Sequence, residues 1–233
     1  MAAVALAPGL WRIPTMPFDL VNSFLLEDDD GSLTLVDTGY KRADRKIVAA
    51  LAGLGKAPED VQRIVLTHAH NDHAGGLAAT KEKTGAAVRS HDRDATYLQS
   101  GTTPQLDASH LKGRLFNRMP AGFAKCDVAQ TFQDGELLPI AGGLRIVHTP
   151  GHTPGHVSLL HEGTGVLITG DAIFNVRGLR YSPATFCTDI KLSRETADRL
   201  ADLEYDIAAF THGGHIARDG REAVRAFLRG RAR

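Results

Sequence analysis

Residues 66–73 read Leu-Thr-His-Ala-His-Asn-Asp-His and place three imidazoles and one carboxylate within six positions. Neutral imidazole and carboxylate groups are ligands that zinc, iron and manganese take in catalytic sites. The stretch contains no cysteine, which argues against a closed structural zinc site. It therefore predicts a catalytic metal site that uses His68, His70, Asp72 and His73.

Histidine is concentrated in three windows of the chain. A lone histidine is usually a surface residue or a hydrogen-bonded core residue, but that interpretation predicts scattered positions. Seven of the eleven histidines instead fall into the three windows, namely His68, His70 and His73, then His152 and His156, then His212 and His215. The clustering favours a shared role in metal binding.

Four apolar runs end in potential ligands: Leu66-Thr-His68, Val147 to His152, Ile168-Thr-Gly-Asp171 and Phe210-Thr-His212. In α/β sheets, ligands gather beyond the carboxyl ends of strands, so these four ends can converge on one site. His152 could join His68 and His70 at one metal. His212 could join Asp72 and His73 at a second, with Asp171 between the two. Two metals about 3.5–4 Å apart can activate a bridging water and clamp the attacked oxygen.

The elements that must position these residues follow an α/β pattern. The first half alternates short apolar runs with segments of helical spacing, and the second half is rich in short β candidates joined by glycine-containing turns. We expect a helix at 193–203 with Ser193 as its N-cap, and a helix at 74–84 capped by Gly85. The predicted strands are 20–26, 33–36, 61–66, 86–89, 128–132, 137–138, 144–147, 156–160, 166–169 and 207–210, and further helices are predicted at 47–54, 92–99 and the C-terminal end.

The 233 residues suit one large domain or two small ones, and we expect a single domain over residues 1–233. Residues 91–125 interrupt the α/β rhythm with a polar stretch and scattered apolar residues. This excursion could be a lid or a wall of the substrate pocket. It could equally be an amphipathic helix packed on the surface or against another subunit.

The balance of charged residues limits the kinds of partner that we expect. Lysine plus arginine equal aspartate plus glutamate at 27 each, so no overall field attracts a polyanion, and we expect no nucleic-acid partner. The apolar stretch at the start of the chain is too short for a signal peptide or a membrane span. We therefore expect a cytoplasmic protein without membrane contact, a small-molecule substrate, and a monomer or homodimer. Cys126 and Cys187 should be free thiols.

These segments resemble the metallo-β-lactamase fold superfamily. The resemblance rests on the motif His68-x-His70-x-Asp72-His73 and on His152, Asp171 and His212, and it runs nearly end to end from Asp37-Thr38-Gly39. It implies a four-layer αββα sandwich with a mononuclear or dinuclear metal site at one edge of the sheets. The metals would be two divalent ions, usually zinc and sometimes iron or manganese. By the same resemblance, Asp37 would orient a ligand histidine, and His156 would form hydrogen bonds within the site.

The resemblance implies a hydrolytic mechanism. A metal-bridging hydroxide would attack a carbonyl or phosphoryl centre, with Asp72 as metal ligand and proton carrier. We therefore expect a metal-dependent hydrolase of a small ester, lactone or thioester. Two alternatives remain, which are a mononuclear iron oxidoreductase of the persulfide dioxygenase type and a non-catalytic metal-binding protein on the same fold.

Departures from known branches narrow the substrate class. Asp171 stands where one subclass of β-lactamases has cysteine, and we expect no helical C-terminal domain of the glyoxalase II-like kind. The chain is similar to quorum-quenching lactonases but has Ile173-Phe174 where they place a tyrosine, so Tyr181 of the same loop could substitute. Phe174, Arg177, Arg180 and Tyr181 could line a substrate pocket or form an exposed loop. His215 is the alternative to His212 as the last ligand.

Overall fold

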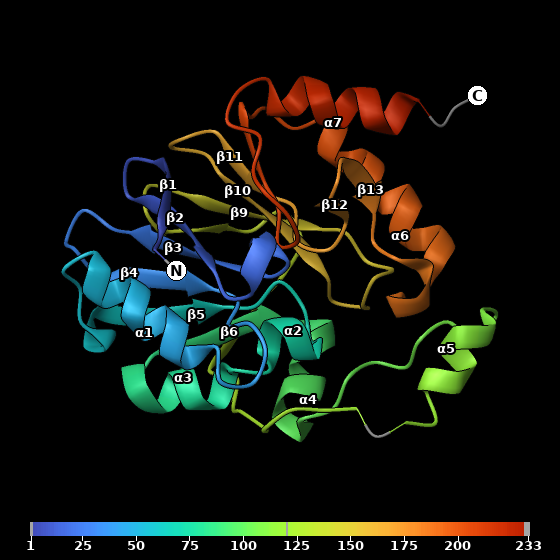
Figure 1. Ribbon diagram of the computed structural model, residues 1–233, viewed down its shortest axis with the longest axis horizontal. Coiled ribbons are helices and arrows are strands. Elements are labelled where there is room, and N and C mark those ends of the chain that lie inside the picture. Colours follow the sequence, from blue (N-terminus) through green and yellow to red (C-terminus); the bar gives the residue numbers. More distant parts are fainter. Residues whose placement is uncertain (1, 120, 231–233) are drawn as a thin grey trace.

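The computed structural model describes residues 2–119 and 121–230, and two β-sheets lie at its centre between two sets of helices (Figure 1). Across these residues, the first sheet has seven strands in sequence order and the second has five in the order β14-β11-β10-β9-β8. The first sheet contains β1 (Val4–Ala7), β2 (Leu10–Pro14), β3 (Asn22–Glu27), β4 (Leu33–Val36), β5 (Val61–Val65), β6 (Ala87–His91) and β7 (Gln130–Phe132). The second contains β8 (Leu137–Leu138), β9 (Leu144–His148), β10 (Val157–His161), β11 (Val166–Ile168) and β14 (Ile207–Ala209).

Strand direction brings the ligand-bearing strand ends to one edge of the two sheets. Strands β4 to β7 are parallel, so Asp37 after β4 and His68 after β5 lie at the same edge. Strands β9 and β11 are both antiparallel to β10 and therefore point the same way, and β14 is parallel to β11. The residues that follow β9, β11 and β14 consequently gather at one end of the second sheet.

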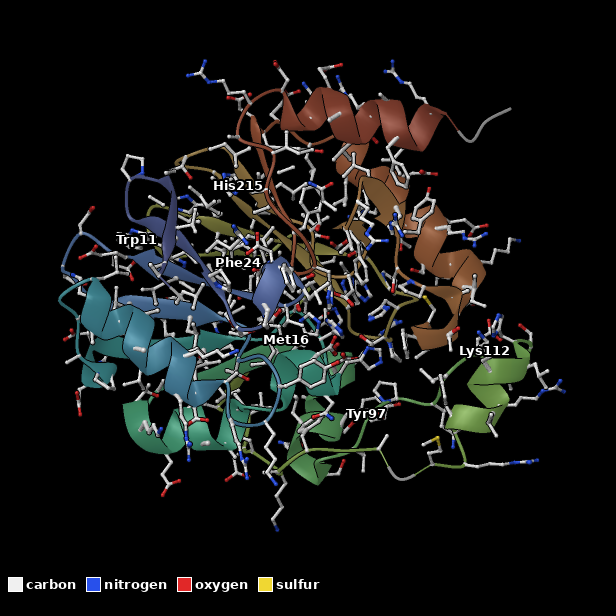
Figure 2. All side chains as sticks on the ribbon, in the orientation of Figure 1. Trp11, Met16, Phe24, Tyr97, Lys112 and His215 are labelled. Atoms are coloured by element: carbon white, nitrogen blue, oxygen red, sulfur yellow. The ribbon has the colours of Figure 1, made fainter. Side chains whose placement is uncertain are left out.

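Three apolar layers hold the elements together. Between the sheets, Phe24 of the first packs in one cluster with Ile146 of the second. The outer face of the first sheet is covered by α1 (Asp44–Gly53), α3 (Leu77–Thr84) and α4 (Asp92–Ser100), and the outer face of the second by α6 (Ile190–Ala197) and α7 (Gly220–Arg229). The fold is the expected αββα sandwich, and Figure 2 shows Phe24 in its interior.

Several boundaries differ from the sequence prediction. Strands β1 and β2 were not predicted. Ser193 is not the N-cap of α6, because the helix begins at Ile190 and the Asp189 side chain accepts a hydrogen bond from the Leu192 N–H at 2.9 Å. The α6 helix ends at Ala197 and a 3₁₀ turn, η4 (Asp198–Ala201), replaces the rest of the predicted helix.

The predicted helix at 74–84 is divided in two. The glycine pair at 75–76 separates α2 (Asn71–Ala74) from α3. Gly85 caps α3 as predicted, with φ of 72° in the left-handed region that favours glycine. The break directs α2, which carries Asp72 and His73, toward the sheet edge, independently of the surface helix α3.

Shorter elements surround this edge. They are η1 (Pro17–Asp19), η2 (Pro58–Asp60), α5 (Leu111–Phe116), the ribbon of β12 (Ile173–Asn175) and β13 (Leu179–Tyr181), and η3 (Ala184–Phe186). Helix α5 stands apart from the sheets in Figure 1, and its Lys112 lies at the margin of the molecule in Figure 2. The Phe116 and Phe186 rings stack at 6.1 Å and join α5 to η3. In the described part of the chain, no helix combines the length and apolar character needed to cross a membrane.

Candidate metal centre

Seven residues from distant parts of the chain meet at the sheet edge in two groups. The ligand atoms of each group lie within 4.8 Å of one another. We call the group of His68, His70 and His152 site 1, and the group of Asp72, His73, Asp171 and His212 site 2. Among the described residues His215 belongs to neither group, so the structure brings His212 and not His215 to the cluster.

Asp171 faces both sites. Its Oδ2 lies 3.0 Å from His152 Nε2 and 3.9 Å from His68 Nε2. Its Oδ1 lies 3.3 Å from the Nε2 atoms of both His73 and His212. One carboxylate therefore presents one oxygen to each group, an arrangement suited to bridging two cations.

The spacing in site 2 fits a tetrahedral cation. His73 Nε2 and His212 Nε2 lie 3.3 Å apart, and Asp72 Oδ2 lies 3.6 Å from the first and 3.4 Å from the second. Zinc bonds of about 2.0–2.1 Å to nitrogen and oxygen imply tetrahedral ligand separations of about 3.3–3.4 Å. The donor atoms of site 2 thus surround a space of the right size for a divalent metal.

Site 1 fits a cation on different grounds. His68 Nε2 and His70 Nε2 are buried and have no hydrogen-bond partner among the described residues. His70 Nδ1 lies 2.8 Å from His152 Nε2. Buried polar atoms without partners are unfavourable, and a cation would satisfy lone pairs that converge in this way. The nitrogen and oxygen donors of both sites suit zinc, iron or manganese.

The second ring nitrogen of four histidines is held by the surrounding protein. The partners are Thr67 Oγ1 for His68 at 3.0 Å, Asp37 Oδ2 for His73 at 2.8 Å, Ser182 Oγ for His152 at 2.9 Å and the Leu20 carbonyl for His212 at 2.5 Å, each on Nδ1. Such contacts fix the ring orientation and leave Nε2 available as a ligand atom. Four of the five clustered histidines are therefore preorganised by their neighbours.

Asp37 occupies the position expected of an orienting carboxylate. It is fully buried and accepts hydrogen bonds from the Thr67 N–H at 2.8 Å, the Thr67 hydroxyl at 2.7 Å and His73 Nδ1. Its φ of 59° is unusual for a residue other than glycine. The strained turn after β4 directs the Asp37 carboxylate toward residues 67–73, which we call the metal loop. The contact with Asp37 links the first sheet to His73.

His156 lies directly behind Asp171. Its Nε2 accepts a hydrogen bond from the Asp171 N–H at 2.7 Å, while Nδ1 lies 2.9 Å from the Thr149 carbonyl. Burial, and then the proximity of His152, lower the pKa of His156 to about 3. A neutral ring is what this geometry requires, since Nε2 must accept a hydrogen bond. His156 thus positions the backbone of Asp171 and belongs to neither ligand group, although its ring lies 5.2 Å from that of His68.

The clustered side chains shift one another's pKa values. Burial opposes protonation of His152, but Asp171 outweighs it and raises the pKa of His152 to about 9. Burial and then His152 lower the pKa of His70 to about 3. Burial would raise the pKa of Asp72, yet the adjacent His73 holds it below the usual value. A metal ion must displace a proton from His152, so metal affinity should rise with pH.

A cavity of about 780 Å³ opens onto both groups and includes Asp72, His152, Asp171 and His212 in its lining. Its walls are largely apolar and come from three separate segments, represented by Met16, Leu20, Phe116, Met119, Phe174 and Phe186. The Phe174 ring packs on His212 with centroids 4.2 Å apart. The excursion at 91–125 supplies part of this wall through residues 102–106 and through Phe116, Asn117, Met119 and Ala121. The cavity suits a small ligand with an apolar body beside the two groups.

The other three residues expected in the pocket lie outside it. Arg177, Arg180 and Tyr181 are absent from the cavity lining. Tyr181 pairs across the β12–β13 ribbon with Ile173, whose side chain is buried in the core beneath α7. The Tyr181 ring accordingly packs 5.0 Å from Phe227 of α7. Its ring therefore packs beside α7 and is not among the described residues that line the cavity.

Tyr40 is a cavity residue that the sequence did not indicate. It follows Asp37-Thr38-Gly39 and lines the cavity together with the metal-facing residues. Burial, followed by the charges of Asp72 and Asp171, raises the pKa of Tyr40 to about 12. Its hydroxyl therefore stays protonated at neutral pH and can donate a hydrogen bond to a bound substrate.

Asp94 is a second residue that the sequence did not indicate. It is buried in α4 and accepts hydrogen bonds from the Ala69 N–H at 2.8 Å, the Thr153 hydroxyl at 2.7 Å and the Gly155 N–H at 2.6 Å. Ala69 lies between His68 and His70, whereas Thr153 and Gly155 follow His152. Asp94 therefore ties together the two loops that form site 1.

Replacement of Asp94 by asparagine should weaken both the fold and site 1. An amide cannot accept all three hydrogen bonds and would direct a donor at a donor, so we expect a loss of about 3 kcal/mol in unfolding free energy. Loosening of the two loops should weaken zinc binding about tenfold or more. Urea unfolding and zinc competition titration measure the two effects. Asp92→Asn, an exposed change in the same helix, is the control, and equal zinc affinity in both variants would contradict this role for Asp94.

Comparison with known proteins agrees with this architecture. The family model described as the metallo-beta-lactamase superfamily matches residues 16–212. A probable metallo-hydrolase, YybB of Bacillus subtilis (strain 168), is 30% identical over 199 residues, which are 84% of this chain and 82% of the relative. An N-acyl homoserine lactonase of a Bacillus species is 28% identical over an alignment of 223 residues, and the alignment covers 81% of this chain and 79% of the relative.

Solved structures extend the similarity to three dimensions. A metallo-beta-lactamase family protein from Thermus thermophilus superposes with a TM-score of 0.73 at 31% identity. The alignment covers 98% of this chain and 81% of the other. The motif, the sandwich and the two groups at its edge agree with these matches, and the chain belongs to the metallo-beta-lactamase superfamily.

Proposed function

We propose that this protein is a dinuclear metal-dependent hydrolase, with zinc as the preferred metal, that acts on a small ester, lactone or thioester. One observation carries the proposal, namely that the two oxygens of Asp171 face two separate sets of nitrogen and oxygen donors. Membership of a metallo-hydrolase family supports hydrolysis as the reaction, and the lactonase relative supports a carboxylic ester or lactone as the substrate. We further propose that residues 1–233 form one domain.

The residues divide the chemistry between them. Metals bound at sites 1 and 2 would lower the pKa of water and polarise the substrate carbonyl. Asp72 faces the cavity, with about a fifth of its side chain exposed (22%), and its lowered pKa keeps it ionised. An ionised carboxylate there can accept a proton from the attacking water and return it to the leaving group.

The cavity walls orient the substrate. The Tyr40 hydroxyl can donate a hydrogen bond to the carbonyl oxygen or to the leaving oxygen. Phe174 and Phe116 would pack against the acyl part and exclude bulk water, which strengthens electrostatic interactions inside the cavity. Such walls favour a carbonyl compound with an apolar body.

Metal content and a substrate panel test the proposal together. The purified protein should contain about two zinc ions per chain and should hydrolyse at least one member of a panel of lactones, aryl esters, thioesters, phosphodiesters and β-lactams. We expect activity on lactones, esters or thioesters, because the cavity beside the metals is mostly apolar and carries no lysine or arginine among its described lining residues. One iron per chain with no hydrolysis in any class would overturn the proposal.

A further inference from the structure

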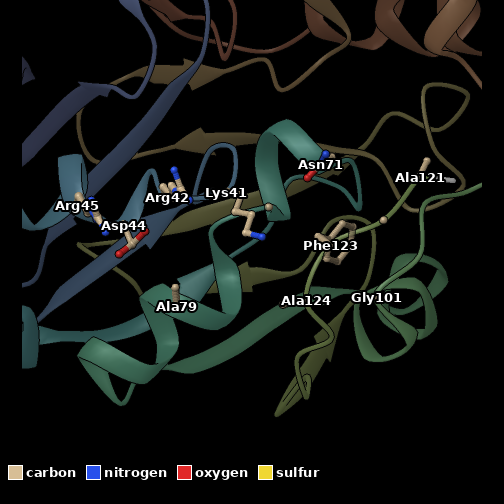
Figure 3. Close-up of a pocket in the computed structure, with 12 residues that line it drawn as sticks. Lys41, Arg42, Asp44, Arg45, Asn71, Ala79, Gly101, Ala121, Phe123 and Ala124 are labelled. Carbon is tan, nitrogen blue, oxygen red and sulfur yellow. The ribbon is translucent and has the colours of Figure 1, made fainter.

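A second cavity adjoins the metal-facing one. It has a volume of about 790 Å³ and lies between the start of α1, the metal loop and the segment at 121–124. Asn71 and Ala121 line both cavities, so the two meet at these residues. Figure 3 shows Lys41, Arg42 and Arg45 on one side of the second cavity and Phe123 on the other, with the Lys41 ammonium directed toward the Phe123 ring.

The charge of this cavity is positive. Lys41, Arg42 and Arg45 all line it, and within the described residues none of these side chains has an ion-pair or hydrogen-bond partner. Asp44 is the one carboxylate in the described lining, and it is paired with Lys83 at 2.5 Å. The three cations are therefore not neutralised by the protein, in a chain whose formal net charge is zero.

The backbone that carries Lys41 is fixed to the metal loop. A Cβ at Gly75 would lie 2.2 Å from the Asn71 carbonyl oxygen and 2.8 Å from the Lys41 nitrogen. The Gly76 N–H donates to the Gly39 carbonyl at 3.0 Å. Segment 39–41 thus packs directly on α2, which bears Asp72 and His73. The backbone at Lys41 is therefore fixed relative to the metal centre, whereas the Lys41 side chain itself is exposed.

We propose that the second cavity is an anion subsite that extends the metal-facing pocket, so that the substrate combines an apolar acyl region with a carboxylate or phosphate group. The acyl region lies among the apolar walls near Phe174, and the anionic group passes Asn71 and Ala121 to reach Lys41 and Arg45. The inference rests on the proposed hydrolase function and deepens it. Two features distinguish the second cavity, namely the wall that it shares with the metal-facing cavity and the apolar Phe123 opposite Lys41.

Matched ester pairs test the subsite. The first pair is mono-4-nitrophenyl glutarate and 4-nitrophenyl pentanoate, which have acyl chains of equal length with and without a terminal carboxylate. The second pair is 3-carboxyphenyl acetate and phenyl acetate, which carry the charge on the leaving group. The double variant Lys41→Met/Arg45→Met removes two cations of the subsite. Lys112→Met on α5 is the control, because exposed Lys112 lines neither cavity.

The zinc-loaded wild-type protein should prefer the anionic member of at least one pair in kcat/KM, and 0.5 M NaCl should reduce that preference. The double variant should lose about tenfold in kcat/KM for that ester while the neutral partner changes less than twofold. The Lys112→Met protein should behave as wild type. If both variants retain the same preference, or if wild type has none in either pair, the subsite is wrong. If wild type hydrolyses no ester of either pair, the proposed function fails for simple esters. The subsite is then tested by inorganic phosphate binding, measured by calorimetry. Phosphate binding must be weaker in the double variant than in wild type for the subsite to stand.

Discussion

Replacement of Asp72 by alanine should reduce turnover by orders of magnitude in a protein that remains folded. Asp72 Oδ2 lies within 3.6 Å of both His73 Nε2 and His212 Nε2, so its loss removes a donor from site 2 together with the group proposed to carry the proton. Proton transfer by a positioned side chain alone contributes about 10²–10⁴-fold to a rate. Steady-state kinetics on the preferred substrate of the panel measure the effect.

Folding and metal content must be followed in the same protein. Asp72 lies on the short α2 at the cavity surface, so circular dichroism should show a native fold, and metal analysis should show loss at site 2 with retention at site 1. Asp202→Ala, which removes an exposed carboxylate far along the chain, should keep full activity. Turnover of Asp72→Ala within about twofold of wild type would exclude the role proposed for this carboxylate.

The residues of the two groups could be found from sequence because each one follows directly on an apolar strand. His68, His152, Asp171 and His212 lie three or four residues beyond β5, β9, β11 and β14, and those strands all point toward the same edge. A short distance from a buried strand leaves the side chain little freedom of placement. The pattern of apolar strands therefore predicts both the fold and the residues of the cluster.

The supporting residues could not be found in this way. Asp94 lies within a helix and Tyr40 in a loop, and neither stands at a ligand-like spacing in the sequence. Their roles depend on which loops pack against them, as the three donors around Asp94 illustrate. Tyr181 illustrates the same limit, because the sequence does not indicate its pairing with Ile173 or the contact of its ring with Phe227.

The ends of helices also include some that the sequence predicts and some that tertiary contacts decide. Gly85 is predictable because a left-handed cap favours glycine, whereas the sequence predicts Ser193 as the cap of α6 and the structure uses Asp189. The Asp189 N–H donates to the Gly151 carbonyl at 2.8 Å, a contact with the loop before His152 that the sequence does not indicate. Where two residues of one segment can both cap a helix, tertiary contacts decide which of them is the N-cap.

Removal of divalent metal should lower the melting temperature by about 10 °C. Without a cation, site 1 holds buried ring nitrogens that lack partners, and Asp171 must be balanced by protonated histidines. A ligand present at 1,000 times its dissociation constant stabilises a protein by about 4.1 kcal/mol. For a chain of this length, each kcal/mol corresponds to about 2–4 °C. Calorimetry of the chelator-treated and the zinc-reconstituted protein measures the difference.

The pH dependence of this stabilisation identifies the ligands. Metal binding must displace a proton from His152, whose pKa without metal is about 9, so the zinc-dependent increase in melting temperature should be larger at pH 8 than at pH 6. Asp171→Asn should lose most of the increase at both values, because the amide offers neither site an anionic oxygen. His215→Ala should keep the full increase, since His215 lies outside both groups. Equal melting temperatures with and without zinc at pH 8 would show that the two groups do not form a metal centre.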